Sequence, residues 1–596
     1  MKSRTLQNRF SKTDLAAAVT FVALAVFLVF SAYFSDMVPD EAYYYTLPQR
    51  FLQGDGMFAQ EWEMSQIHAV FLFLPYLLYT RIAGGTDGII LFMRYLFIFA
   101  DLALYCWFYR KLREYGAAAV AASALFCADQ FFGILALNYY NMALTEIVIF
   151  ILMLFFSKKE LSAPRLFVAG IVLSCAVLNQ ISLAILYILY TVFVMIRLSD
   201  KKDRLSRFSS VLAFRNWLWI TAGVAVCAAA FLIYLQATVG LAQIMKTLPD
   251  MFINGEYEMK WYGNSEWKTK FGRVASVFGV LLMILLPLFA LVCAILMRKR
   301  KSARLRAGLA YASFALYLLF FIRASFGLAE SFSEPMPYSF FICFYITAAI
   351  PVYVFGFIFY LLCDHRDKKM LVFWIAALCA SACVDYISYT TIAYGARLAY
   401  FFTVYYQFEL IRELRGMSEN GREPRTLCKS LPRAVAVLLL ICQAANISFQ
   451  RDYVFINNKA YPDASVDRIE TGPLRGTYNN AAYVDGCYAI LADLDRYKSV
   501  NGGKAYIPAL LPYTYLYLDQ EICANTAYFV AEDFPEQICR YWGRNPSKRP
   551  TYIYIPYNAM FSEYDRTVSA LKQVCECVLT EGSGGAIAQI IKWNEG

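Results

Sequence analysis

The chain has 596 residues, of which 59% are hydrophobic and only 17% are charged, and its mean hydropathy is +0.46. Because an average soluble domain carries roughly 25% charged residues, this composition excludes an ordinary soluble protein and indicates an α-helical polytopic membrane protein. The net charge of +10 comes from lysine and arginine clusters in short loops, a distribution that does not fit a nucleic-acid-binding surface.

The first apolar segment, residues 15–34, is long enough to cross a bilayer. A helix rises 1.5 Å per residue, so about twenty residues span the ~30 Å hydrocarbon layer. The segment does not end in a small-residue cleavage site, which predicts a retained first helix and not a signal peptide.

Two adjacent carboxylates, Asp40 and Glu41, follow this helix in the sequence VPDEAYYYT. One interpretation is structural: Asp40 caps a short helix that runs through Tyr45, Glu41 suits its first turn, and Pro48 ends or kinks it. The other is catalytic: Asp40 takes a proton from an acceptor hydroxyl while Glu41 orients the acceptor or helps to hold a cation. Spacing alone does not separate the two.

The apolar run 67–83 contains Pro75 and is expected to lie in the outer interface without crossing. If it crossed, the basic cluster at 110–113 would be placed outside the cell, against the positive-inside pattern. His68 opens this run, either as a residue solvated at the interface or as a ligand for phosphate.

Thirteen segments are expected to cross the membrane: 15–34, 89–109, 117–137, 141–157, 165–178, 182–196, 215–236, 274–297, 305–322, 338–361, 370–389, 394–411 and 432–448. With a cytoplasmic N-terminus, the clusters of lysine and arginine then all fall on the cytoplasmic side. The membrane region is residues 1–448, with long outer loops at 35–88 and 237–273.

Three charged residues lie near the outer ends of these segments. Arg94 and Arg397 are candidates to bind a phosphate, since the planar guanidinium suits phosphate oxygens; the alternative is snorkelling to the interface. Glu146 is a catalytic candidate because intramembrane carboxylates are often functional, and the alternative is pairing with a neighbouring helix.

Residues 449–596 have a soluble composition with Asn, Asp, Pro and Gly punctuation. Their pattern predicts helices near 483–498 and 562–574 and strands near 504–508, 551–555, 574–580 and 586–593. This alternation indicates a small α/β domain, which thirteen crossings place outside the cytoplasm.

The first outer loop carries an ordered set of residues: Pro39, Asp40, Glu41, Tyr44 and Gly54-Asp55. This set resembles that of the membrane-embedded, lipid-phosphosugar-dependent glycosyltransferases of the GT-C class. The class includes the protein O-mannosyltransferases and the bacterial aminoarabinose transferase that acts on lipid A, related to glycosyltransferase family 39. His68 and Arg94 also match in position, whereas Ala69 and Val70 replace two prolines of the group.

The resemblance implies a GT-C-like fold and an inverting transfer of a sugar from a polyprenyl-phosphate donor to an acceptor at the cell surface. Asp40 would be the general base and Glu41 its support. Some relatives use a divalent metal such as Mg or Mn and others do not, so the cofactor is left open.

In this interpretation the donor lipid lies between helices, with its phosphate near Arg397 and His68. Aromatic side chains would contact the sugar or cover it. Tyr44 would stack on the sugar ring, and the alternative is that it belongs to the ordinary belt of tyrosines at a membrane interface. Trp261 and Tyr262 of the second outer loop would form part of a lid. The protein would be a multi-pass enzyme of the bacterial cell membrane with its C-terminal domain recognising the acceptor.

Two rival functions are a lipid-linked glycan flippase or other transporter, and a non-catalytic membrane scaffold. A transporter of this size predicts inverted repeats or paired broken helices near the bilayer midplane, and the sequence shows neither. A scaffold is distinguished from an enzyme by substitution of Asp40, which should abolish sugar transfer in an enzyme and have no effect on a scaffold.

Overall fold

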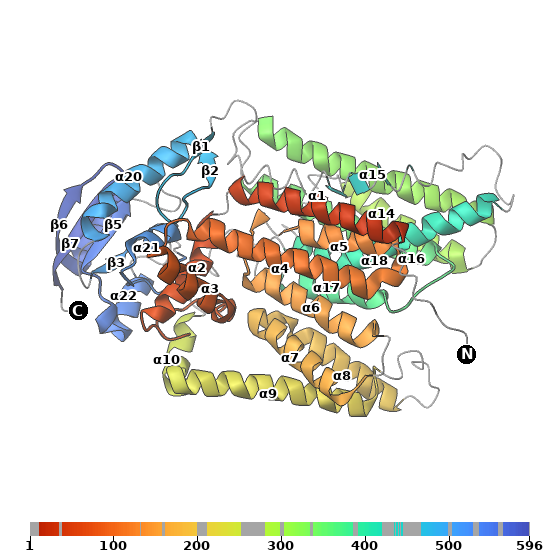
Figure 1. Cartoon of the computed structure of the whole chain (residues 1–596), viewed down its shortest axis with the longest axis horizontal. Helices are drawn as coiled ribbons and strands as arrows, with labels where there is room; N and C mark the ends of the chain where they lie inside the picture. The colour runs from red at the N-terminus through yellow and green to blue at the C-terminus, as the bar shows by residue number, and fades with distance from the viewer. Residues whose placement is uncertain are drawn as a thin grey trace.

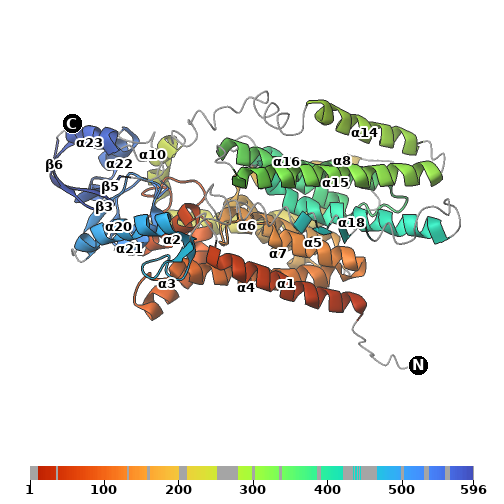
Figure 2. The same ribbon diagram turned by 90° about the horizontal axis from the view of Figure 1, so that it is seen from above.

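The computed structural model is an elongated molecule with a helical bundle at one end and an α/β domain at the other (Figures 1 and 2). It describes residues 11–34, 38–130, 133–157, 161–199, 211–251, 280–298, 303–333, 338–384, 391–419, 466–498, 503–528, 536–557 and 564–594, with isolated helical positions between 434 and 444. Most of the expected span 432–448, the residues Trp261 and Tyr262, and the boundary between 448 and 449 lie outside the described residues.

Long helices run side by side through the bundle, as both views show. They are α1 (Lys12–Phe34), α4 (Ile89–Leu112), α5 (Ala117–Ala128), α6 (Tyr139–Phe155), α7 (Ala163–Asn179), α8 (Ala184–Ser199), α9 (Phe214–Thr238), α14 (Val280–Arg298), α15 (Ala303–Ser333), α16 (Tyr338–Leu362), α17 (Leu371–Val384) and α18 (Thr391–Glu419). Each coincides with a predicted apolar segment, although the bounds shift.

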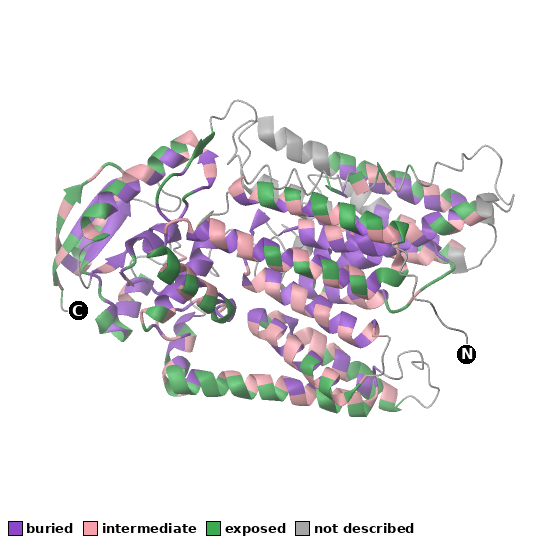
Figure 3. Ribbon diagram, viewed as in Figure 1, coloured by how far each residue is buried: buried purple, intermediate pink, exposed green. Residues whose placement is uncertain are grey.

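Within the described residues, five helical segments are long and apolar enough to cross a membrane: Lys12–Phe34, Ile89–Tyr115, Ile181–Ser199, Phe214–Thr238 and Arg304–Arg323. Apolar side chains point outward from the rim of the bundle, as Leu15 of α1 (65% exposed) and Ile233 of α9 (68% exposed) show, and Figure 3 shows both helices exposed along their outer faces. An apolar exterior of this kind suits lipid. The expected number of thirteen crossings is not confirmed.

The third predicted segment, 117–137, is too long. Helix α5 ends at Ala128 and α6 begins at Tyr139, and in the stretch between them the described residues 129–130 and 133–138 form no α-helix. Gly133 adopts φ +69° in that stretch, and the Asn138 side chain accepts a hydrogen bond from the Asn141 N–H to cap α6. Residues 129–137 were predicted to continue the helix because they are largely apolar, but the helix ends before them.

The helix around Asp40 is longer than expected. Helix α2 (Val38–Leu52) begins before Asp40 and continues past Pro48. It packs along α21 (Pro512–Leu518) of the C-terminal domain, and Gln49 Nε2 donates to the Tyr515 carbonyl oxygen at 3.0 Å. These tertiary contacts hold the helix together where a proline removes one backbone donor. Helix α3 (His68–Ala83) follows on the same side of the molecule.

The C-terminal domain contains a five-stranded mixed sheet in the order β4-β3-β5-β7-β6. Its elements are α20 (Ala481–Lys498), β3 (Lys504–Tyr506), α21, β4 (Glu521–Ile522), α22 (Glu536–Arg544), β5 (Tyr552–Pro556), α23 (Tyr564–Val574), β6 (Cys575–Glu581) and β7 (Gly585–Trp593). The predicted helices and strands are confirmed. A short hairpin of β1 (Val466–Arg468) and β2 (Tyr478–Asn480), together with β4, α21 and α22, was not predicted.

Buried charges join this domain to α2 and to the loop that follows it. Arg50 Nε lies 2.8 Å from Asp55 Oδ2, and Arg50 Nη1 lies 2.9 Å from Glu61 Oε2, with both ion pairs almost fully buried. Lys548 of the C-terminal domain completes the group by pairing with Asp55. The loop that follows Asp40 is thereby fixed against the sheet domain.

Candidate active site

Asp40 lies in the first turn of α2, just beyond the end of α1, and is partly buried. Burial raises the pKa of its carboxyl to about 7; a hydrogen bond from the Tyr528 side chain opposes this rise and the nearby charge of Glu41 adds to it. Tyr528 belongs to the segment after β4. A carboxyl with a pKa near neutrality is suited to accept and release protons at physiological pH.

Glu41 has a different environment from its neighbour. Its Oε2 lies 2.7 Å from Arg94 Nε and 2.6 Å from Arg94 Nη2, and its Oε1 accepts the Leu135 N–H at 2.8 Å. Arg94 Nη1 also donates to the Ala32 carbonyl oxygen at 2.6 Å. All of these side-chain groups are buried.

These contacts tie α2 to α1, α4 and the irregular stretch before α6. The guanidinium of Arg94, which the sequence suggested for a donor phosphate, faces Glu41 instead. Glu41 and Arg94 therefore hold the start of α2, which carries Asp40, against the bundle.

His68 packs into a group of aromatic rings beside α2. Its ring centroid lies 5.1 Å from that of Tyr44 and 5.9 Å from that of Tyr139, and the two tyrosine rings are 6.0 Å apart. Burial lowers the pKa of His68 to about 3, although a backbone hydrogen bond at Ser65 opposes this shift. At neutral pH the imidazole is therefore uncharged and offers a hydrogen-bond donor, not the positive charge that the sequence suggested.

Both His68 nitrogens are buried without a well-formed hydrogen bond among the described residues. Buried polar groups in native proteins nearly always have a partner. A substrate oxygen would supply one here.

The aromatic group continues to Arg397. Tyr139 and Tyr140 are 4.0 Å apart between ring centroids, and Tyr140 and Tyr394 are 5.2 Å apart. Tyr394 lies one helical turn before Arg397 on α18. The structure thus brings together Asp40, Tyr44, His68 and Arg397 along one aromatic row, composed of Tyr44, His68, Tyr139, Tyr140 and Tyr394.

Arg397 is buried, with 2% of its surface exposed, and its partners are neutral. Nε and Nη2 donate to the Phe126 carbonyl oxygen at 3.1 and 3.0 Å, and Nη1 donates to Asn141 Oδ1 at 2.6 Å. The guanidinium also lies 4.5 Å from the Phe126 ring centroid. No carboxylate neutralises it in the described chain. A buried charge of this kind is costly unless an anion compensates it.

Glu146 is not part of this row. It lies on α6, and Asn179 at the end of α7 donates to its two carboxylate oxygens at 3.4 and 3.1 Å. This contact favours the interpretation in which Glu146 links two helices.

Sequence reasoning missed Tyr528, Tyr139 and Asn141. Tyr139 and Asn141 stand in a Tyr-Tyr-Asn run at the start of a predicted helix, a signal that was available. Tyr528 contacts Asp40 only because of the fold of the C-terminal domain. No local sequence pattern could therefore predict its place in the site.

The described residues around Asp40 do not form an evident site for a divalent metal. Mg²⁺ and similar ions need several oxygen ligands, whereas Glu41 is already bonded to Arg94 and the Leu135 N–H. Within the described ranges, no group of three or more His, Cys, Asp or Glu side chains is placed to hold a metal ion.

No family model and no curated protein sequence matches this chain. Two solved structures are similar to it along most of its length. One is the crystal structure of the Archaeoglobus fulgidus oligosaccharyltransferase tethered with an acceptor peptide containing the NVT sequon: it is 13% identical, the TM-score is 0.44, and the match covers 98% of this chain and 74% of that one. The other is the archaeal oligosaccharyltransferase AglB from Archaeoglobus fulgidus in complex with an inhibitory peptide and a dolichol-phosphate, with a TM-score of 0.42 and the same identity and coverage. Likeness at this level does not by itself assign an activity.

Proposed function

We propose that this chain is a membrane glycosyltransferase of the GT-C class, which moves a sugar from a polyprenyl-phosphate donor to an acceptor outside the cytoplasm. The observation that carries the proposal is the aromatic row with a base at one end and a cation at the other. Asp40 has a pKa of about 7, and Arg397 is a buried guanidinium bonded only to neutral groups.

In the proposed reaction Asp40 takes the proton from an acceptor hydroxyl as its oxygen attacks the anomeric carbon. The bond between that carbon and the phosphate oxygen breaks on the opposite face, so the configuration inverts. The leaving group is polyprenyl phosphate, and the proton remains on Asp40 until it is released to solvent. Arg397 stabilises the negative charge that develops on the phosphate.

The aromatic row would hold the sugar between these two groups. Tyr44 and Tyr139 offer ring faces that suit the apolar face of a pyranose or furanose. Uncharged His68 would donate a hydrogen bond to a sugar hydroxyl or to a phosphate oxygen. In this arrangement the sugar also bonds the imidazole nitrogens, for which the described residues supply no well-formed hydrogen bond.

The proposed topology keeps the N-terminus in the cytoplasm and places Asp40 and the C-terminal domain outside, in a multi-pass protein of the cell membrane. Residues 1–448 would bind the donor, and residues 449–596 would meet the acceptor. The contact of Tyr528 with Asp40 supports this division, because it brings the C-terminal region to the side where the acceptor hydroxyl must enter.

The direct test is a transfer assay with the purified full-length chain in lipid nanodiscs. A polyprenyl-phosphate sugar and the corresponding nucleotide sugar are offered in parallel, with an envelope extract as acceptor. We expect transfer from the lipid donor only. Transfer from the nucleotide sugar, or none from a panel of lipid donors, would count against the proposal.

The variant Arg397→Gln is expected to weaken donor binding. A hydrogen bond to a charged group contributes about 1.5–3 kcal/mol, so the KM for the donor should rise about tenfold or more while the KM for the acceptor stays unchanged. Arg496→Gln is the matched control, because Arg496 is exposed on α20. An unchanged donor KM in Arg397→Gln would remove Arg397 from the phosphate site.

The variant Tyr528→Phe is expected to move the acid limb of the pH profile. Only ionised Asp40 accepts a proton, so wild-type kcat/KM should rise with pH through about 7. The Tyr528 hydroxyl stabilises the carboxylate, and its loss raises the pKa of Asp40 further, by about one unit if the bond contributes about 1.5 kcal/mol. The acid limb should therefore shift to higher pH.

The control for this shift is Tyr557→Phe, which removes a hydroxyl bonded to Glu581 elsewhere in the same domain. Its pH profile should match that of the wild type. If Tyr528→Phe also matched the wild type, Asp40 would not be the group that controls the acid limb.

A further inference from the structure

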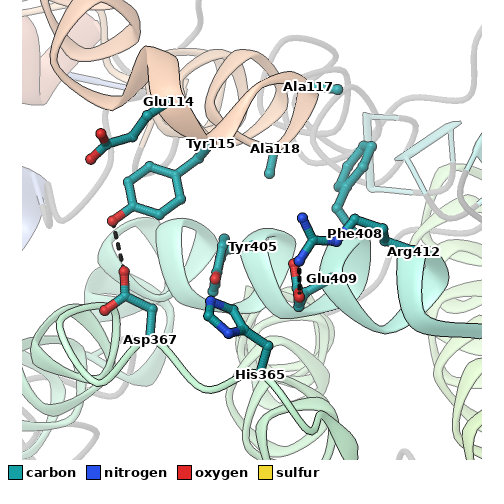
Figure 4. Close-up of a pocket in the computed structure, with 10 residues that line it drawn as sticks. All are labelled: Glu114, Tyr115, Ala117, Ala118, His365, Asp367, Tyr405, Phe408, Glu409 and Arg412. Carbon is teal, nitrogen blue, oxygen red and sulfur yellow. Dashed lines mark hydrogen bonds and ion pairs between the residues drawn. The ribbon is translucent and has the colours of Figure 1, made fainter.

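A pocket lies at the opposite end of the bundle from Asp40. It has a volume of about 370 Å³ and opens between the start of α5, the loop after α16 and the last turns of α18 (Figure 4). Arg113, two residues before the pocket residue Tyr115, pairs with Asp14 in the first turn of α1, whereas Asp40 follows the end of that helix. The 23 residues of α1 separate the two sites by roughly 35 Å.

Aromatic rings form part of the pocket wall. Tyr115 and Tyr405 meet edge to face with their ring centroids 5.2 Å apart, and Phe408 lies one turn further along α18. The faces of such rings attract cations, most strongly where water is partly excluded. The small side chains of Ala117 and Ala118 leave the space above these rings open.

The charged residues of the wall are mostly acidic. Glu114, Asp367 and Glu409 face only Arg412 and His365 among the lining residues. The balance is negative whether His365 is protonated or not. The pocket therefore favours a positively charged ligand.

Glu409 is the carboxylate available to such a ligand. Its side chain is only 7% exposed, and Oε1 lies 2.5 Å from Arg412 Nη2. Its other oxygen makes no hydrogen bond or ion pair with the described residues. Asp367, by comparison, accepts hydrogen bonds on both oxygens, from the Tyr115 hydroxyl at 2.8 Å and the Lys369 N–H at 3.0 Å.

Arg412 adds a second element of recognition. Its side chain is 71% exposed at the mouth of the pocket although one amino group is bonded to Glu409. The remaining N–H donors face solvent, next to the site where Glu409 would hold a cation. A ligand that carries an ammonium and a phosphate a few bonds apart would satisfy both residues.

We propose that this pocket binds a primary ammonium group, held by Glu409 against the Tyr405 and Phe408 rings, with an adjoining phosphate on Arg412. The chemistry is that of a phosphoethanolamine head group, and the same ammonium could come from a membrane lipid or from a soluble amine. The site is independent of the proposed transfer reaction and lies at the other end of the bundle.

The test measures thermal unfolding and lipid retention by native mass spectrometry on the full-length protein. Phosphatidylethanolamine is compared with phosphatidylcholine and phosphatidylglycerol of the same acyl chains, and free ethanolamine is added in a separate arm. The variant Glu409→Gln keeps an acceptor for Arg412 and removes the charge. Glu576→Gln, an exposed carboxylate of β6, is the control.

We expect selective retention of phosphatidylethanolamine, with about a tenfold loss in Glu409→Gln and none in Glu576→Gln. Stabilisation by the lipid alone identifies a head-group site, and stabilisation by free ethanolamine as well identifies a soluble amine as a ligand. A second variant, Ala117→Leu, fills the pocket from an exposed position and should produce the same loss without changing a charge. Equal retention of the three lipids with no response to ethanolamine, or an unchanged preference in both variants, would overturn the proposal.

Discussion

Asp40→Asn is expected to abolish sugar transfer while leaving the protein folded. The amide preserves the size of the side chain and can still accept the hydrogen bond from Tyr528, but it cannot take a proton. A positioned general base typically contributes 10²- to 10⁴-fold to the rate, so kcat should fall by about that factor. The measurement is kcat with the lipid donor at saturation, beside the melting temperature of both proteins.

The control for this experiment is Asp87→Asn, which changes a carboxylate in the loop between α3 and α4, away from the aromatic row. It should retain wild-type transfer. Asp40→Asn also separates the rival functions, because a flippase or a scaffold has no use for a proton acceptor at this position. A variant that transfers sugar at the wild-type rate would refute the role of Asp40.

Glu41→Gln is expected to cause the largest loss of stability. The substitution removes a carboxylate charge that lies 2.6 Å from the buried guanidinium of Arg94. Breaking a buried ion pair by removing one partner costs about 3–5 kcal/mol, a large share of the roughly 5–15 kcal/mol that keeps a typical domain folded. The variant should unfold at a markedly lower temperature and give less monodisperse protein.

Two further variants show whether the ion pair is the cause. Replacing both partners with leucine, Glu41→Leu with Arg94→Leu, removes the uncompensated charge and should recover part of the stability. Asp14→Asn removes the partner of Arg113 in a pair whose arginine side chain is 57% exposed, and it should change the melting temperature much less than Glu41→Gln does. If Glu41→Gln were as stable as Asp14→Asn, the ion pair would not anchor α2.

The sequence was sufficient for most elements because their signals are local. Apolar segments of spanning length marked the bundle helices, and the run Tyr552–Pro556, which is rich in tyrosine and isoleucine, marked a strand that is buried at every position. Where hydropathy and backbone geometry disagree, the sequence misleads. Residues 129–137 are apolar enough for a helix, but the chain turns at Gly133 and restarts at the cap provided by Asn138.

The candidate site was predictable in its residue types but not in its pairing. Asp40, His68 and Arg397 each stood out as a polar residue in an apolar setting, and the fold connects them through aromatic rings. The sequence could not tell which arginine faces a carboxylate: Arg94 bonds Glu41, whereas Arg397 bonds an amide and a carbonyl. That distinction depends on which helices become neighbours.

The contact between Tyr528 and Asp40 makes the proposed general base depend on two parts of the molecule. Asp40 is anchored to the bundle through its neighbour Glu41, while the hydroxyl that lowers its proton affinity arrives from the sheet domain. Tilting one part away from the other would therefore weaken the acidity of this carboxyl before any helix unfolds. The protonation state of Asp40 therefore depends on whether the helical bundle and the sheet domain are in contact.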